Sequence, residues 1–152
     1  MKTISDKVIE KTIVINCSID TAWWKWTTHK GLLTFFGSDN KIDLKLEGSY
    51  EIYFLLDNPE GLKGGEGNKI LSYSPKEMLS FTWNAPPEYP EIRNHNHSTW
   101  VVVNFKAINE IHTKVTLKHL GWLTGENWDK VYNYFDSAWD TVLNSLEKSC
   151  KK

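Results

Sequence analysis

The chain has 152 residues, of which 40% are hydrophobic and 13% are aromatic. This length suits a single domain, residues 1–152, that buries a core without help from disulfides or metals. Its 18 Lys and Arg residues nearly balance 19 Asp and Glu residues, and Arg93 is the only arginine. Because nucleic-acid recognition relies on clustered basic side chains, especially arginine, we expect no nucleic-acid partner.

The N-terminal segment MKTISDKVIEKTIVI mixes charged and apolar side chains and contains no continuous apolar run. It therefore predicts neither a secretory signal nor a membrane span, and a cytoplasmic location follows by default. The only two cysteines are Cys17 and Cys150. In a reducing compartment we expect them to be free thiols rather than a disulfide.

A strand and two short helices are predicted for the first part of the chain. Residues 7–15 alternate between apolar and polar positions in the manner of a strand. Ser18 or Asp20 can cap the helix that follows. Gly31 lies in the stretch that separates this helix from a second short helix through Phe35. Together the two helices would form a compact corner.

Four strands separated by turns are predicted for the middle of the chain, at residues 41–46, 50–56, 68–73 and 78–83. The glycine-rich segment 62–67 lies between the second and third of these strands. A phosphate-binding loop requires a helix directly after its glycines, whereas here a strand follows. We therefore interpret the segment as a turn and not as a phosphate site.

A long loop and a hairpin come next. Residues 84–97 contain three prolines and show no periodicity, which predicts a loop long enough to serve as a lid or specificity element. Strands are predicted at 98–107 and 111–120, joined by a tight turn. The order of elements favours an α+β fold with an antiparallel sheet, because parallel strands require helices between them.

Residues 125–146 carry the clearest pattern in the sequence. Apolar side chains recur there at steps of three and four, which places them on one face of a long helix: Trp128, Val131, Tyr132, Phe135, Trp139, Val142, Leu143 and Leu146. So wide an aromatic stripe must lie against a large apolar surface, here the sheet. A helix held by a curved sheet commonly leaves a pocket between the two.

Short motifs follow one another in a fixed order along nearly the whole chain. They are Cys17–Trp23, Leu32–Phe36, Glu47–Tyr50, Gly64–Gly67, Pro75–Trp83, Lys118–Trp122 and Ala138–Leu146. Their order and spacing resemble the Hsp90 ATPase activator-like family (AHSA1-type) of the START-like, or SRPBCC, helix-grip superfamily. The resemblance implies a Bet v 1-like fold, in which a curved antiparallel sheet of about six to seven strands wraps around the long C-terminal helix. The extra tryptophans of this chain would narrow the cavity.

Strand alternation and the helix stripe select the side chains that would bind a ligand. These are Tyr50, Ile52, Phe54, Phe81, Trp83, Trp100, Val101, Val103, Leu117, His119, Trp128, Tyr132, Phe135 and Trp139. The aliphatic members can equally be ordinary core. The tryptophans, Tyr132 and His119 carry hydrogen-bonding atoms that would orient a ligand in an apolar site.

His119 is the most informative titratable residue, because alternation points it inward. No nucleophile or carboxylate stands at a recognised spacing from it, so we favour a structural or ligand hydrogen bond over a general-base role. His95 and His97 would share a face, as two metal ligands do. They lie in a proline-rich loop without a third ligand, so we expect a solvated loop and neither a metal nor a cofactor.

Three functions remain open. The favoured one is non-catalytic binding of a small hydrophobic or aromatic ligand, or a lipid, gated by the 84–97 loop and by the helical corner near Trp23 and Trp26. The resemblance implies an alternative, a chaperone-interaction module that binds an Hsp90-type partner in a stress response. The third is an enzyme that uses His119 in the cavity. The exposed faces show no heptad or apolar seam, so we expect a monomer or weak homodimer.

Overall fold

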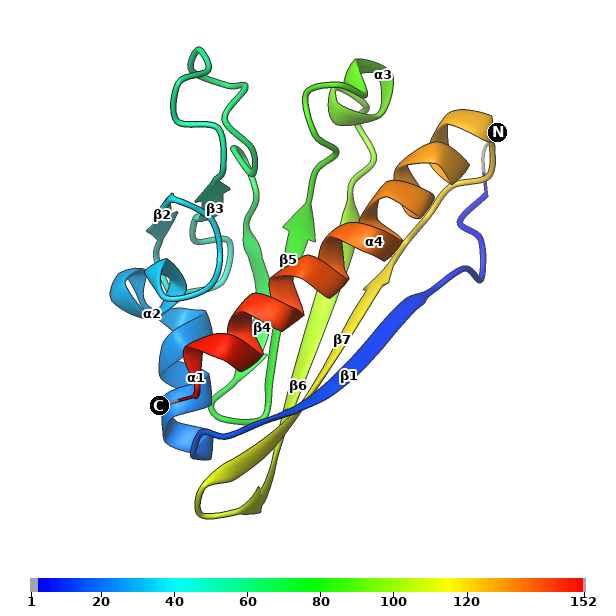
Figure 1. Cartoon of the computed structure of the whole chain (residues 1–152). Helices are drawn as coiled ribbons and strands as arrows, with labels where there is room; N and C mark the ends of the chain where they lie inside the picture. The colour runs from blue at the N-terminus through cyan, green and yellow to red at the C-terminus, as the bar shows by residue number, and fades with distance from the viewer. Residues whose placement is uncertain (1–2, 152) are drawn as a thin grey trace.

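The computed structural model describes residues 3–151 as a curved sheet crossed by one long helix (Figure 1). Five antiparallel strands lie side by side in the order β1 (Ile9–Ile15), β7 (His112–Leu120), β6 (Thr99–Asn109), β5 (Met78–Trp83) and β4 (Ile70–Ser74). A second ladder joins β2 (Asp39–Ile42) to β3 (Tyr50–Tyr53). A single bridge between Ser49 and Lys69 continues the sheet from β4 toward β3. The predicted helix-grip architecture is confirmed.

Two short helices, α1 (Ile19–Thr27) and α2 (His29–Leu33), follow β1 as predicted. Ser18 caps α1, since its hydroxyl accepts a hydrogen bond from the Thr21 N–H at 3.1 Å. Thr28 caps α2 in the same way through the Gly31 N–H. A Cβ at Gly31 would lie 2.1 Å from the Trp24 carbonyl oxygen, so only glycine permits this tight corner.

The clearest differences from the predictions are two strand boundaries and one additional helical turn. The first hairpin strand, β2, begins and ends earlier than expected, because the chain turns after Ile42 through hydrogen bonds such as Gly48 N–H to the Lys45 carbonyl. Its partner β3 ends at Tyr53 instead of continuing to residue 56. The loop 84–97 contains one helical turn, α3 (Pro90–Arg93), which begins at a proline whose fixed φ suits that position.

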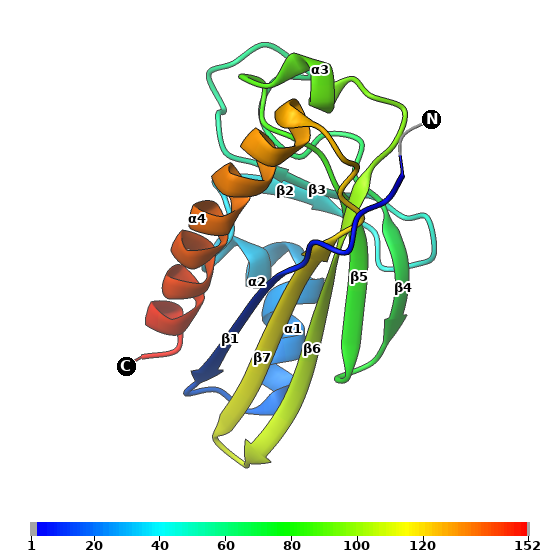
Figure 2. The same cartoon turned by 90° about the vertical axis from the view of Figure 1, so that its right-hand side faces the viewer.

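The long helix α4 (Glu126–Ser149) crosses the concave face of the sheet diagonally (Figures 1 and 2). Most of the predicted stripe is buried, and Tyr132 and Val142 are half-buried at its edges. The opposite face is charged and pairs with residues near and within β1. The Lys11 ammonium lies 3.0 Å from the Asp136 carboxylate and 3.3 Å from that of Asp140.

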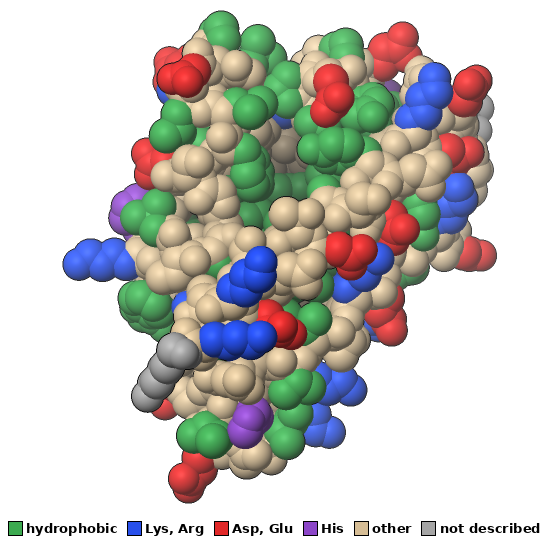
Figure 3. All heavy atoms as spheres, viewed as in Figure 1, with side chains coloured by type: hydrophobic (Ala, Val, Ile, Leu, Met, Phe, Trp, Pro, Cys, Tyr) green, Lys and Arg blue, Asp and Glu red, His purple; other side chains and the backbone are tan. Residues whose placement is uncertain are grey.

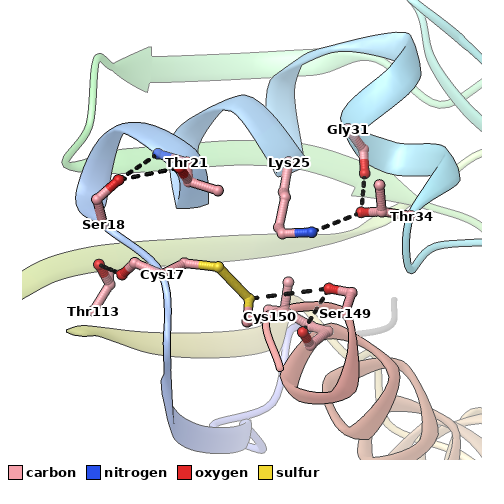
Figure 4. The surroundings of a disulfide bond; sticks show 10 residues. Cys17, Ser18, Thr21, Lys25, Gly31, Thr34, Thr113, Ser149 and Cys150 are labelled. Atoms are coloured by element: carbon pink, nitrogen blue, oxygen red, sulfur yellow. Dashed lines mark hydrogen bonds between the residues drawn. A yellow bond between two sulfur atoms is a disulfide. The ribbon is translucent and has the colours of Figure 1, made fainter. Parts of the chain in front are cut away.

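The prediction of two free thiols is wrong, because Cys17 and Cys150 form a disulfide (Figure 4). The two residues are separated by 133 positions in sequence, but their Cα atoms lie 5.8 Å apart, within the range that a disulfide spans. Cys17 follows β1 and Cys150 ends α4, so the bond ties the end of the long helix to the start of the helical corner. Sequence spacing carried no signal for this pairing.

Within residues 3–151, no helix combines the length and the apolar character needed to cross a membrane.

Candidate ligand-binding cavity

A cavity of about 580 Å³ opens between α4 and the sheet. Figure 3 shows it as a recess bordered largely by hydrophobic side chains, between the segment around β3 and the N-terminal half of α4. Its walls are mainly aromatic: Phe36, Phe54, Trp83, Tyr134, Phe135 and Trp139. Small and aliphatic residues complete them, namely Gly64, Pro86, Ala138 and Val142, and the polar contributors are Asn84, Ser137 and Thr141. Among the residues that the structure describes, no charged side chain lines this cavity.

Four parts of the chain build the walls, and one of them is Phe36, which follows α2. The middle of α4 supplies one side, because positions three and four apart on a helix share a face. Trp83 ends β5, and Asn84 and Pro86 continue from it along the mouth. The opposite rim holds Phe54 and Gly64. Gly64 has φ 146°, and a Cβ there would lie 2.7 Å from the Phe54 ring, so the loop can approach this ring only with glycine.

The aromatic rings contact one another and form a continuous surface. The ring centroids of Trp83 and Trp139 are 5.5 Å apart. Phe36 lies 5.5 Å from Trp83 and 5.8 Å from Trp139, in tilted and edge-to-face arrangements that aromatic pairs favour. Because these rings also belong to the core, the surface is rigid and preformed.

His119 holds part of this surface in place from behind. The Trp139 indole N–H donates to His119 Nδ1 at 3.0 Å, so the neutral ring carries its proton on Nε2. That N–H donates to the Thr99 hydroxyl at 2.7 Å, and the hydroxyl donates to the Trp83 carbonyl at 2.9 Å. The hydrogen bonds thus run in one direction from one cavity tryptophan to the backbone of the other.

Burial lowers the pKa of His119 to about 3, and the ring is completely enclosed. Both ring nitrogens already have partners, and the residue does not line the cavity. The geometry therefore gives His119 a positioning role rather than contact with a reacting group.

Arg93 links two loops beside the cavity mouth, and we call its set of contacts the Arg93 latch. The Arg93 guanidinium, which is 6% exposed, donates to the carbonyls of Gly61, Gly64 and Ala85 and lies 3.2 Å from the Glu66 carboxylate. Burial alone would raise the pKa of Glu66, but hydrogen bonds from backbone N–H groups and the Arg93 charge outweigh it and lower this pKa. Arg93 thereby fastens the predicted lid segment to the loop 61–66.

A second chamber, of about 20 Å³, adjoins the main cavity and shares Trp83, Asn84 and Phe135 with it. We call it the polar annex, because its other walls include Arg93, His95, His97, Thr99 and Trp128. The His97 Nε2–H donates to the Gly121 carbonyl at 2.7 Å. No group of three or more His, Cys, Asp or Glu residues that could hold a metal occurs among residues 3–151.

The structure brings together some of the predicted ligand-binding residues and separates others. Phe54, Trp83, Phe135 and Trp139 line the main cavity, and Trp128 lines the polar annex. Seven others are fully buried in the packed core and line neither chamber: Tyr50, Ile52, Phe81, Val101, Val103, Leu117 and His119.

Tyr132 and Trp100 also line neither chamber. Tyr132 is half-buried at the edge of α4 beside β1, with its hydroxyl 3.4 Å from the Val8 carbonyl. Trp100 alternates with the buried positions of β6 and packs on the outer face of the sheet, where a Cβ at Gly121 would meet its ring. Neither Trp23 nor Trp26 lines the mouth; the helical corner contributes Phe36 instead.

Several cavity residues escaped the sequence analysis. Tyr134, Ala138 and Thr141 recur at steps of four and three beside the apolar stripe, so helical periodicity could have found them. Phe36 belongs to a motif that was recognised but not assigned to the pocket. Gly64 and Asn84 lie in loops, so no periodic pattern in the sequence could have identified them.

No protein-family model and no curated protein matches the sequence. Solved structures do match its fold. Protein MLL2253 from Mesorhizobium loti is 15% identical with a TM-score of 0.73, and the match covers 94% of this chain and 96% of that one. The Aha1 dimer from Colwellia psychrerythraea is 17% identical with a TM-score of 0.70, over 95% and 96% of the two chains.

An Hsp90 activator from Plasmodium falciparum is 18% identical, with a TM-score of 0.70 over 92% of this chain and 93% of that one. The resemblance to Hsp90 activator-like proteins inferred from the motifs is thus confirmed at the level of the fold. Identities this low are evidence for the shared architecture alone.

Proposed function

We propose that the protein binds a small, neutral, largely aromatic molecule in the cavity beneath α4. The observation that carries this proposal is a 580 Å³ cavity whose walls include six aromatic rings and no charge. Its volume falls within the range typical of small-molecule sites. A charged group would lose its hydration there without gaining a partner, which favours a neutral ligand.

The lining supports binding rather than catalysis. Within residues 3–151, Tyr134 is the only residue with a titratable side chain in the lining of the main cavity. Burial raises its pKa, so the phenol stays protonated at neutral pH. His119, the predicted alternative, is sealed behind Trp139 and is already hydrogen-bonded at both nitrogens. General acid–base chemistry requires a group within reach of the reacting atoms, and among residues 3–151 the main cavity is lined by no carboxylate or imidazole.

The test fills the cavity without removing its walls. Ala138→Phe adds a ring inside the lining, and the control Asn133→Phe adds the same ring on the exposed face of the same helix. Native mass spectrometry first asks whether a small molecule accompanies the purified protein. Titration with the neutral fluorophore N-phenyl-1-naphthylamine then measures affinity. We expect about tenfold weaker binding in Ala138→Phe only, and equal affinity in all three proteins would contradict the proposal.

Chaperone interaction is a second candidate, favoured by the structural similarity to Aha1 and to an Hsp90 activator. It would place the protein in a stress response and allow a homodimer, as in the similar Aha1 structure. The measurement is the ATPase rate of an Hsp90 chaperone with and without saturating protein. A rate that stays unchanged would remove this candidate, whereas Ala138→Phe should leave any stimulation intact.

The cytoplasmic location stays a prediction. The Cys17–Cys150 disulfide bears against it, because structural disulfides are rare in reducing compartments. Thiol alkylation in intact cells distinguishes the two: rapid labelling of both cysteines supports a cytoplasmic location, and complete protection argues for an oxidising one.

A further inference from the structure

The polar annex has the size of one small chemical group. Its volume of about 20 Å³ exceeds the roughly 10–15 Å³ that a single water-sized probe requires. Because it shares Trp83, Asn84 and Phe135 with the main cavity, the two chambers lie side by side. A molecule that spans both would place its body among the aromatic rings and a single polar atom in the annex.

One wall of the annex carries a buried donor without an acceptor. Trp128 is 1% exposed, and within residues 3–151 its indole Nε1–H has no hydrogen-bond partner. By contrast, the indole N–H groups of Trp122 and Trp139 both donate at 3.0 Å. Leaving a buried donor unpaired disfavours the folded state, so an acceptor placed against it is favoured.

A neighbouring ring supplies a second donor. His95 Nδ1 accepts the His97 backbone N–H at 3.0 Å, so a neutral His95 ring carries its proton on Nε2. That Nε2–H has no protein partner in the part of the chain that the structure describes. The ring stands edge-to-face with Trp128, with their centroids 5.2 Å apart. Both groups donate, so the complementary ligand atom is an acceptor.

Most of the other polar side chains of the annex already have partners, and Ser98 is exposed to solvent. Arg93 is matched by Glu66 and three carbonyls, so its charge is not available to a ligand carboxylate. Asn84 accepts from Asn68 and donates to the Glu66 carbonyl. These pairings leave no uncompensated positive charge in the annex and favour a neutral acceptor.

We propose that the annex binds a carbonyl oxygen, and hence that the ligand is an aromatic ketone or a related aromatic carbonyl compound. The ring system lies in the main cavity, and its oxygen accepts from the Trp128 indole N–H with His95 beside it. This inference rests on the proposed function and specifies its ligand class.

The test compares two isosteric probes, 2-acetylnaphthalene and 2-isopropenylnaphthalene, which differ by an oxygen in place of a methylene. Affinities are measured by calorimetry. We expect wild type to bind the ketone about fivefold more tightly than the hydrocarbon, as one added hydrogen bond allows. Trp128→Phe keeps an aromatic ring but removes the donor, so this preference should vanish.

Trp26→Phe is the matched control. Trp26 is also fully buried with an unpartnered Nε1–H, but it lines neither chamber. Its substitution should keep the preference for the ketone. On wild type alone, the indole ¹H–¹⁵N resonance of Trp128 should move downfield with the ketone and not with the hydrocarbon. This readout needs no variant and holds even if Trp128→Phe does not fold.

The outcomes separate the two proposals. If both probes bind wild type equally and the Trp128 resonance does not respond to the ketone, the annex holds at most a water, and the carbonyl proposal is overturned while the cavity stands. If neither probe binds, the proposed function fails and the carbonyl proposal with it. A ketone preference that survives in Trp128→Phe also overturns the assignment of the donor.

Discussion

The two ends of α4 both carry large apolar side chains, but one end is fixed in the core and the other lines the candidate site. At the C-terminal end, Leu143 and Leu146 are buried in the core and Cys150 bonds to Cys17, so the helix is fixed covalently (Figure 4). Toward the N-terminal end, Phe135 and Trp128 line the two chambers, and the Trp128 indole N–H has no partner in the part of the chain that the structure describes. Gly125, which precedes the helix, provides no side-chain cap.

This difference shows that aromatic side chains alone do not distinguish a packed core from a candidate ligand-binding site. Trp139 and Trp128 belong to one apolar stripe and are equally buried. Both line a chamber, but the Trp139 indole N–H donates to His119, whereas within residues 3–151 the Trp128 indole N–H has no partner. What sets Trp128 apart is therefore an unpaired buried donor beside open volume, and not its aromatic character.

The largest expected effect on stability comes from removing the disulfide at the C-terminal end of α4. Cys17→Ser removes a bond that spans 133 residues, and we expect the free energy of unfolding to fall by about 2–5 kcal/mol. Urea unfolding with and without dithiothreitol measures it. The reductant should lower the stability of wild type to that of the variant and leave the variant unchanged. Equal stability of wild type in both conditions would contradict this.

The next effect tests the network between the two ends. Because burial lowers the pKa of His119 to about 3, the unfolded chain alone protonates this ring as the pH falls below about 6.5. The stability that the neutral ring provides is complete above pH 6.5 and is lost toward pH 3. We expect His119 to account for a loss of about 2 kcal/mol between pH 7 and pH 5, measured by urea unfolding.

His119→Gln separates this effect from other titrating groups. The glutamine amide can accept from Trp139 and donate to Thr99, but it does not titrate. The variant should be less stable at pH 7 and should lack this component of the pH dependence. Identical slopes for both proteins between pH 7 and pH 5 would show that His119 does not carry it.

A smaller effect on stability is expected from weakening the contacts of Arg93 beside the cavity mouth. Arg93→Lys keeps the charge but loses the planar group that reaches three carbonyls and Glu66, so we expect a loss of about 1 kcal/mol. Hydrogen exchange should accelerate in the loop 61–67 and stay unchanged in the hairpin of β6 and β7, which serves as the internal control. Uniform acceleration in both regions would mean that the latch is not local.

The smallest effect concerns the ion pairs on the outer face of α4. Lys11 hydrogen-bonds to Asp136 and Asp140, which raise its pKa despite partial burial. Lys11→Met should lower the free energy of unfolding by about 0.5 kcal/mol, as partly exposed pairs typically do. The control is Lys41→Met, since Lys41 forms no ion pair within residues 3–151. A difference between the two variants that persists in 1 M NaCl would contradict an ionic origin.

The sequence by itself determined the local elements and the class of fold. Periods of two and of three to four residues identified the strands and α4, because one face of each must be buried. The same patterns placed Trp83, Phe135 and Trp139 on inward faces, and the motif order indicated the helix-grip architecture. These properties depend on residues near one another in sequence.

Only the tertiary structure decided which inward residues fill space and which border it. Val101 and Trp83 both point inward and are buried, but Trp83, at the end of β5, lines the cavity, whereas Val101 lies within the packed core. The Cys17–Cys150 bond, the Arg93 latch and the unpaired Trp128 donor likewise join segments far apart in the chain. Cavities and long-range pairings arise from how elements pack, and local periodicity carries no information about the volume left between them.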